Sequence, residues 1–360
     1  MNRKIILIKE WDFVRVVASL SIVLLHSTTK IARVNGHIDH DLYQFLRVLL
    51  TGSTAIFVLL SILIIAYVYK DRIPTDFIRK RLKYILLPFF FFAITYAVYY
   101  GLIVEDGNFY NRLLSNFKGG FVGWFILPIF QLYLVFWILK KTKLDKNGII
   151  IFLMLIGLYY LAIFSTGQTR GLYIDLNMKV LFPIWLVYFG IAYFIGKYYK
   201  SFSNLLEKKY SFIIILSLFI LSILLIKYNF DNGNRSVHSR RIDLVPYVTM
   251  FSILLLYIGK KIPHLFIIRY LSKYAFGIYL LHWLLQKILA PHFASLHNTF
   301  LQISGLFLVS VIGCIVVINL ILLIPFNKFM IGNIKPNPSL LNLLIDKFDH
   351  TAKDKGSSRV

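Results

Sequence analysis

Residues 12–28, DFVRVVASLSIVLLHST, form an apolar stretch that contains two ionisable side chains, Arg15 and His26. Such side chains are rare inside a membrane, and they usually face a bundle interior or a water-filled cavity. In a helix, the eleven-residue step between them corresponds to about 16 Å along the axis and almost three turns. Both side chains therefore face the same way at different depths, which predicts a polar site between helices. In the alternative interpretation, Arg15 extends to the lipid headgroups and His26 hydrogen-bonds to a neighbouring helix.

The composition of the whole chain is that of a membrane protein. Of 360 residues, 58% are hydrophobic and 17% are aromatic, and the mean hydropathy is +0.71. About 20 apolar residues are enough to cross the hydrocarbon core of a bilayer. We expect about ten crossings, at residues 12–30, 48–69, 84–104, 121–139, 149–164, 179–196, 210–226, 243–259, 270–289 and 301–325. The sequence thus predicts an all-α, polytopic membrane helix bundle.

The charge distribution predicts the orientation of this bundle. The net charge is +24, yet its basic residues lie in short loops, so we expect no nucleic-acid partner. Lys and Arg are more frequent at the amino-terminal end and in every second loop after it. The positive-inside rule therefore places both termini in the cytoplasm. The first apolar stretch lacks a small-residue cleavage site, which indicates a retained helix and not a signal peptide.

Residues 1–326 are expected to form one membrane-embedded domain, and residues 327–360 a short cytoplasmic tail with a short helix near residues 338–348. The tail is too short for a soluble catalytic domain, so any chemistry belongs to the bundle. The single cysteine, Cys314, excludes a disulfide within the chain and argues against a cysteine metal cluster. We expect no metal site.

Two basic loops have different interpretations. Residues 70–83, KDRIPTDFIRKRLK, lie on the predicted cytoplasmic side, where they serve either as a topology signal with affinity for anionic lipids or as a binding site for a phosphorylated donor. The loop near residues 227–242, which contains KYNFDNGNRSVHSRR, lies on the opposite side. Positive charge there opposes the general bias, which indicates either contact with an external substrate or an ordinary solvated loop.

A second histidine lies at a comparable depth in another apolar stretch. His282 falls within SKYAFGIYLLHWLLQKIL, and the first and ninth stretches are predicted to run in the same direction. The two histidines can therefore meet inside the bundle. Histidine is the usual general base for removing a proton from a hydroxyl, although one of the pair can equally be a structural hydrogen-bond partner.

Four segments in a fixed order resemble a known family. They are DFVRVVASLSIVLLH, FVLLSILIIAY followed by FIRKRLKYILLP, GWFILPIFQLY, and AFGIYLLH. Their order over residues 10–325 is similar to that of the type-3 membrane acyltransferases, which include O-acetyltransferases and succinyltransferases of surface polysaccharides. Within this family the chain looks most like short stand-alone members encoded near exopolysaccharide loci.

The resemblance implies roles for individual residues. The catalytic histidine of the family falls on His26, its paired arginine on Arg15, and the acidic residue three positions earlier on Asp12. In the basic pair associated with the acyl-CoA donor, the first position is Arg81, while Tyr84 occupies the second, next to Lys83. Ile62 replaces a family glycine after Ser61.

The aromatic motif of the family falls on Trp124 and Tyr133, and Gln131 adds a polar group between them. The resemblance implies that these residues line a pocket or contact the acceptor. Trp and Tyr also populate membrane interfaces because of their amphipathic shape alone.

The expected reaction is therefore transfer of an acetyl or succinyl group from cytoplasmic acyl-CoA to a hydroxyl of a cell-surface or exported polysaccharide. Arg79, Lys80, Arg81 and Lys83 are expected to hold donor phosphates, and His26, Arg15 and His282 to form the catalytic set. No bound cofactor is expected beyond this co-substrate. The expected partners are membrane lipid, a glycan or lipid-linked glycan, and a polysaccharide-synthase complex in a bacterial plasma membrane. The alternatives are an exporter of an exopolysaccharide such as poly-N-acetylglucosamine, and a structural protein.

Overall fold

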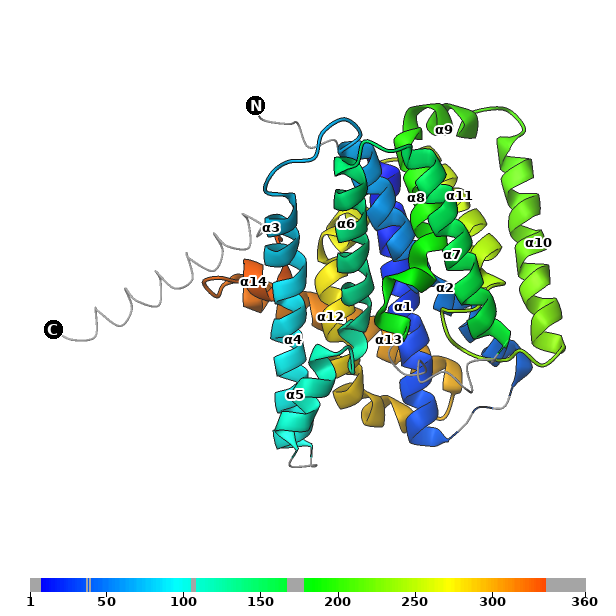
Figure 1. Cartoon of the computed structure of the whole chain (residues 1–360). Helices are drawn as coiled ribbons and strands as arrows, with labels where there is room; N and C mark the ends of the chain where they lie inside the picture. Colours follow the sequence, from blue (N-terminus) through cyan, green and yellow to red (C-terminus); the bar gives the residue numbers. More distant parts are fainter. Residues whose placement is uncertain (1–7, 37, 39, 105–107, 167–177, 335–360) are drawn as a thin grey trace.

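The chain folds into a bundle of helices that lie side by side (Figure 1). The computed structural model describes residues 8–36, 38, 40–104, 108–166 and 178–334, and these residues contain helices but no strand. Each predicted apolar stretch corresponds to one helix, namely α1 (Lys9–Asn35), α2 (Asp41–Val68), α4 (Leu87–Val98), α6 (Ile126–Lys141), α7 (Lys146–Thr166), α8 (Leu186–Lys197), α10 (Ser211–Asp231), α11 (Leu244–Lys261), α12 (Phe266–Ala294) and α13 (Thr299–Leu322). Short α-helices accompany them: α3 (Phe77–Arg81), α5 (Phe109–Phe117), α9 (Tyr199–Leu206) and α14 (Lys328–Ile331).

Eight helical segments of the described chain are long and apolar enough to cross a membrane. Two predicted crossings are not among them. The sixth is short, since with its preceding 3-10 turn it spans only Phe182–Lys197. The ninth, α12, is long but carries His282 and Gln286, which neighbouring helices bury completely. The prediction of an all-α polytopic membrane bundle is confirmed, with eight segments meeting the criterion of length and composition.

Helices α1 and α12 pack along each other and run in the same direction. Arg15 of α1 contacts Ser272 of α12, Ser27 contacts Gln286, and Asn35 contacts the carbonyl of Ala294. The residue numbers of these contacting pairs increase together along both helices, so the two helices are parallel. The predicted catalytic set, Arg15, His26 and His282, lies on this pair of helices.

Small residues permit close helix contacts elsewhere in the bundle. A Cβ atom at Gly196 of α8 would collide with the carbonyl oxygen of Leu63 and approach the side chain of Ala66 on α2. Close backbone approach through small residues is typical of membrane helices, because lipid tails remove most of the hydrophobic drive for association. The contact of α8 with α2 therefore depends on glycine at position 196.

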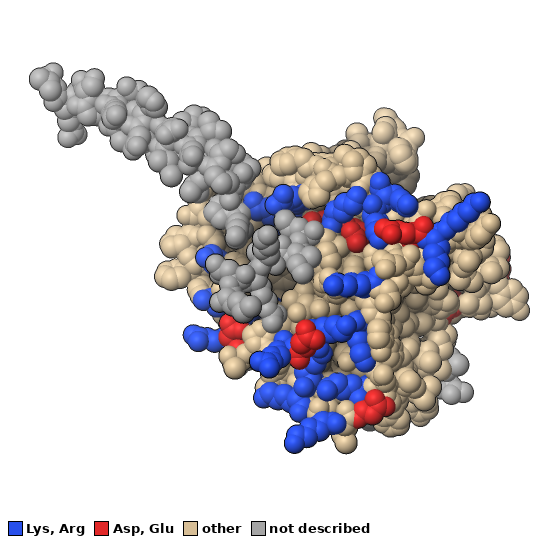
Figure 2. Space-filling model, turned by 90° about the horizontal axis from the view of Figure 1, so that it is seen from above, with Lys and Arg blue, Asp and Glu red and all other residues tan. Residues whose placement is uncertain are grey.

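The two ends of the bundle differ in charge. One end carries the start of α1, α3 and α9 and lies at the top of Figure 1. Figure 2 views it directly and shows many Lys and Arg side chains but few Asp and Glu. We call it the basic end, and we call the end with α5 and the loop between α10 and α11 the far end. The charge distribution predicts that the basic end is cytoplasmic.

The first residues of the predicted tail pack against the bundle. Helix α14 contacts α4, and Ile331 is fully buried. The helix predicted near residues 338–348 lies outside the described residues.

Candidate active site

Two histidines meet between α1 and α12. The ring centroids of His26 and His282 lie 5.2 Å apart, and the rings stack with an interplanar angle of 24°. His282 Nδ1 lies 2.9 Å from the carbonyl oxygen of Ile278. A carbonyl only accepts, so this nitrogen carries the hydrogen. His282 Nε2 and His26 Nδ1 are both buried and have no hydrogen-bond partner within the described part of the chain.

Polar contacts fix the position of the histidine pair. One turn beyond His282, Gln286 Nε2 donates to the carbonyl of Val23 at 2.9 Å and to Ser27 Oγ at 2.8 Å. Gln286 is fully buried, and a buried amide without such partners would be costly. These bonds set the register of α12 on α1 and thereby the relative position of the two rings.

His26 lines a cavity of about 220 Å³. Its walls come from α1, α2 and α12, the 3-10 turns Val122–Phe125 and Met178–Val180, and the loop between α10 and α11. The polar and aromatic side chains on these walls include His26, Trp124, Lys179, His238, Arg240 and Tyr279. His282 is not among the described lining residues, so it supports the His26 ring from behind.

The cavity lies toward the far end. His26 is nine residues from the end of α1 at Asn35 and seventeen from its start at Lys9. These separations correspond to about 14 Å and 26 Å along the helix axis. Under the predicted topology, His26 is therefore closer to the extracytoplasmic side.

Arg15 is part of a polar cluster nearer the basic end. Its Nη1 donates to Asp12 Oδ1 at 2.8 Å and to Ser272 Oγ at 2.7 Å, and Ser272 Oγ donates to the same Asp12 oxygen at 2.6 Å. Arg15 faces α12, as His26 does, in agreement with the predicted spacing. The ion pair with Asp12 compensates the charge of Arg15. Hydrogen bonds that involve a charged donor or acceptor are also stronger than those between neutral groups.

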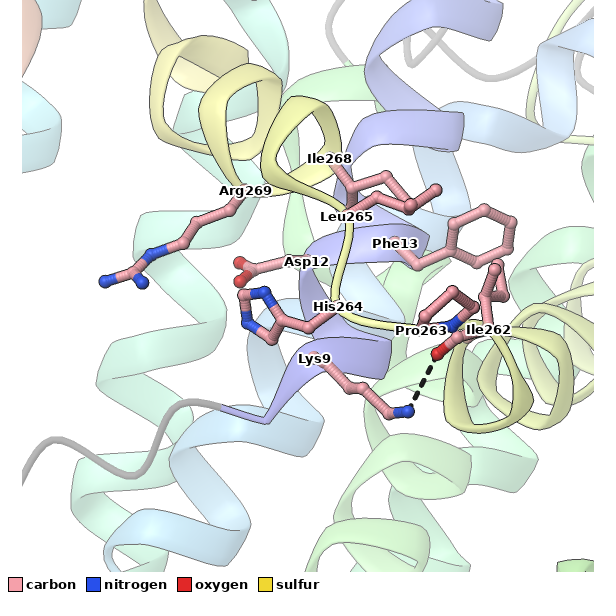
Figure 3. A pocket seen from close by; sticks show the side chains of 10 residues that line it. Lys9, Asp12, Phe13, Ile262, Pro263, His264, Leu265, Ile268 and Arg269 are labelled. Carbon is pink, nitrogen blue, oxygen red and sulfur yellow. Dashed lines mark hydrogen bonds between the residues drawn. The ribbon is translucent and has the colours of Figure 1, made fainter.

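A narrow pocket adjoins this cluster at the basic end (Figure 3). It holds about 10 Å³, close to the minimum for one water molecule. Figure 3 shows Asp12 and His264 pointing toward one another, while Arg269 extends away from them. Lys9 Nζ donates to the carbonyl of Ile262 at 2.8 Å. This pocket is too small for a substrate, in contrast to the cavity at His26.

The basic residues expected to hold the donor lie around α3 at the basic end. Arg79 and Lys80 are exposed, and Lys80 pairs with Asp76 at 2.7 Å. Arg81 turns inward: its Cζ lies 4.7 Å from the ring centroid of Phe77 and 5.1 Å from that of Tyr133. Its Nε is buried without a hydrogen-bond partner among the described residues.

Lys83 adopts a different position from these three. Its Nζ lies 4.9 Å from the ring centroid of Phe329 and 5.6 Å from that of Tyr84. The structure therefore places the four donor candidates in three settings: two exposed, one between aromatic rings, and one beside α14.

The two residues of the aromatic motif and the polar residue between them serve different parts of the molecule. Trp124 lines the cavity of His26. Tyr133 packs near Arg81, at the opposite end. Gln131 accepts a hydrogen bond from the backbone N–H of Phe182 at 3.1 Å and donates to the carbonyl of Val180 at 2.7 Å. Gln131 thus holds the turn that carries Lys179.

Two residues near His26 were not predicted individually from the sequence. Tyr279 precedes His282 by three residues, lines the cavity and donates to the carbonyl of Val122 at 2.6 Å. Trp283 lies edge-on to His26, with ring centroids 4.8 Å apart. Their place beside His282 in the segment YLLHW is the signal that would have identified them.

The outward basic loop was noted in the sequence, and the structure places part of it on the cavity. His238 and Arg240 are lining residues. Burial, with smaller contributions from the nearby charges of Arg240 and Arg241, lowers the pKa of His238 to about 4. His238 is therefore neutral at pH 7. No group of three or more His, Cys, Asp or Glu residues that could hold a metal ion occurs in the described ranges.

Comparisons with known proteins give a consistent result. A family model described as "Acyltransferase domain" matches residues 8–319. The "Putative membrane-bound acyltransferase YfiQ" of Bacillus subtilis (strain 168) is 31% identical over 291 residues, which cover 76% of this chain and 80% of the relative. No solved structure matches the chain significantly.

A second group of relatives carries a different name. The "Probable poly-beta-1,6-N-acetyl-D-glucosamine export protein" of Staphylococcus aureus (strain MSSA476) is 25% identical over 315 residues, which cover 83% of this chain and 89% of the relative. The protein of the same name from Staphylococcus epidermidis is 23% identical over 283 residues, covering 76% and 79%. The family match extends from α1 into α13 and includes both histidines.

Proposed function

The chain belongs to the acyltransferase-domain family, as its resemblance to the type-3 membrane acyltransferases predicts, and on this premise we propose a specific reaction. The protein transfers an acetyl or succinyl group from cytoplasmic acyl-CoA to a hydroxyl of a cell-surface or exported polysaccharide. It does so in a bacterial plasma membrane, with a glycan or lipid-linked glycan as acceptor and a polysaccharide synthase as a partner.

The observation that carries this proposal is the setting of His26. Its Nδ1 is buried without a partner in the described residues, and its ring lines a cavity large enough to admit part of a sugar. A positioned histidine within reach of a hydroxyl acts as a general base. His282 stacks against it but does not line the cavity, which suits a positioning role.

In the proposed step, His26 removes the proton from the acceptor hydroxyl. The oxygen attacks the thioester carbonyl, a C–O bond forms, and the C–S bond breaks. The coenzyme A thiolate leaves and takes up the proton that His26 had accepted. The acyl group is thereby moved without any change in oxidation state.

The donor enters from the basic end. Arg79, Lys80, Arg81 and Lys83 contact its phosphates, because arginine and lysine bind phosphate through charge-assisted hydrogen bonds. Arg81 is the strongest candidate among them, since it lies near two aromatic rings and its Nε has no hydrogen-bond partner among the residues that the structure describes. The pantetheine arm extends along α1 toward His26 and passes Arg15, which helps to stabilise the negative charge that develops on the carbonyl oxygen.

An exporter is the second candidate, because relatives at 25% and 23% identity are named as export proteins. Deletion of the gene, followed by complementation with the wild type or His26→Ala, separates the two. A transferase predicts that polymer still reaches the surface without its acyl groups in the deletion and in His26→Ala. Polymer trapped inside the deletion strain, with acyl content unchanged in the fraction that escapes, would contradict the transferase and support the exporter.

A further inference from the structure

The cavity of His26 has a distinct charge. Lys179 and Arg240 both contribute to its walls, and they come from segments far apart in the sequence. No Asp or Glu occurs among its described lining residues. Both basic residues lie at the far end, where the positive-inside rule disfavours them, so topology does not explain their presence.

The turn that carries Lys179 is held firmly. The indole N–H of Trp185 donates to the carbonyl of Lys179 at 3.1 Å. Gln131 bonds to the two residues that flank Leu181, through the carbonyl of Val180 and the N–H of Phe182. The lysine is thus presented from a fixed backbone and not from a free loop.

Lys179 is one of the residues that line the cavity. Its Nζ is 5.5 Å from the ring centroid of Trp124, and its surroundings contain no carboxylate that pairs with it among the described residues. Burial, with a smaller contribution from Arg240, lowers the pKa of Lys179. The structure therefore keeps a partly buried cation beside a second cation, an arrangement that an anion would stabilise.

The segment that carries Arg240 is also fixed. Its neighbour Arg241 is fully buried and donates to both carboxylate oxygens of Asp243, at 2.9 Å and 2.6 Å, and to the carbonyl of Asn234 at 2.6 Å. The N–H of Arg240 donates to His238 Nδ1 at 3.2 Å. A buried ion pair costs desolvation energy and is weak evidence for stability, but the hydrogen bonds of Arg241 to Asp243 and Asn234 tie this loop together.

Acidic side chains near the far end are already engaged. Asp41 pairs with Arg235 at 2.7 Å, Asp231 with Lys227 at 2.5 Å, and Asp243 with Arg241 at 2.6 Å. These are the Asp residues that the structure describes at this end. Among the described residues, the charged side chains that line the cavity are therefore basic, and a concave site lined by positive charge attracts anionic ligands.

We propose that the acceptor is an anionic glycan, whose phosphate or carboxylate group binds Lys179 beside Arg240 while a neighbouring hydroxyl reaches His26. This inference rests on the proposed function and adds the chemical class of the acceptor. The Trp124 ring, which also lines the cavity, supplies an apolar wall for the sugar. The anionic group comes either from the diphosphate of a lipid-linked sugar or from an acidic sugar of the polymer.

Binding measured without acyl-CoA tests this inference. The purified full chain in phosphatidylcholine nanodiscs is titrated calorimetrically with farnesyl-diphosphate-linked N-acetylglucosamine and with the uncharged farnesyl N-acetylglucosaminide. A disaccharide that contains glucuronate and its methyl ester form a second pair. The variants are Lys179→Gln, Lys179→Arg and the control Lys227→Gln, which removes a lysine at the same end but outside the cavity lining.

We expect the charged member of at least one pair to bind roughly tenfold more tightly than its uncharged counterpart, the effect of one charge-assisted hydrogen bond. Lys179→Gln abolishes this preference, whereas Lys179→Arg and Lys227→Gln retain it. The pair of ligands in which the charged member binds more tightly identifies the source of the anionic group. Equal binding within both pairs, no binding of either anion, or an unchanged preference in Lys179→Gln would overturn the inference. Charge-dependent binding without any acyl transfer would support it and count against the transferase.

Discussion

At the scale of single residues, the two histidines are close together but differ in their surroundings. His26 reaches the cavity, while His282 is fully enclosed and donates to the carbonyl of Ile278. Sequence spacing alone predicted that the two histidines can meet but left open which of them is a structural hydrogen-bond partner. The difference follows from the side of α12 that faces the cavity, where Tyr279 and not His282 forms the wall.

A substitution at His282 distinguishes support from catalysis. His282→Asn retains an N–H group that can donate to the carbonyl of Ile278 but has no basic ring nitrogen. We expect a loss in transfer rate of roughly tenfold or less, whereas loss of the general base at His26 costs about 10²–10⁴-fold. Rates and their pH profile are measured for both variants in the same membranes. If His282→Asn loses as much as His26→Ala, the assignment of the base to His26 is wrong.

At the scale of elements, the apolar stretches were well predicted because a membrane requires about 20 apolar residues per crossing. The sequence could not show that α12 buries polar groups, since His282 and Gln286 find partners on α1 only after packing. For the polar cluster around Arg15, the sequence indicated the acidic residue three positions earlier. It did not indicate Ser272, which also belongs to the cluster but is 257 positions away from the arginine.

The cavity was harder to predict than the helices. Its walls include short turns such as Met178–Val180, whose positions depend on Gln131 in a different helix. Residues such as Lys179 carry no local sequence signal of their function. The outward basic loop was an exception, because its charge opposes the usual distribution across the membrane.

Close packing of α8 on α2 gives a prediction about stability. Gly196→Leu places a side chain where the carbonyl of Leu63 already lies. The clash requires the helices to separate, so we expect destabilisation of about 1–3 kcal/mol, as is typical of overpacking. The midpoint of thermal unfolding in detergent is the measurement. The control is Ile213→Leu, at an exposed position of α10, which should leave the midpoint unchanged. Gly233→Leu is unsuitable as a control, because the positive φ of Gly233 would strain any other residue.

At the scale of the whole molecule, the charge difference between the two ends predicts orientation. In a Cys314→Ala background, cysteine is introduced at exposed Lys209 near the basic end or at exposed Asn232 near the far end. A membrane-impermeant maleimide added to intact cells should label Asn232→Cys, while Lys209→Cys reacts only after permeabilisation. The reverse pattern would place the cavity of His26 toward the cytoplasm and would remove the proposed route from cytoplasmic donor to external acceptor.

The orientation of the bundle determines which side of the membrane the donor residues and the cavity of His26 each face. The basic residues around α3 and the cavity of His26 lie toward opposite ends of the bundle, about 26 Å of α1 separating His26 from the start of that helix. A donor bound on one side and an acceptor on the other would meet within the protein. The central claim is therefore that His26 is the base for acyl transfer across this bundle.

Inverted membrane vesicles test that claim most directly. Vesicles that contain equal amounts of wild type, His26→Ala or the control His297→Ala receive radiolabelled acetyl-CoA or succinyl-CoA from outside, and label is measured in the glycan they enclose. His297 is exposed in the loop between α12 and α13 and does not line the cavity. We predict that one thioester labels glycan with wild type and His297→Ala, and that His26→Ala lowers the rate by about 10²–10⁴-fold. Undiminished labelling with His26→Ala would contradict the account.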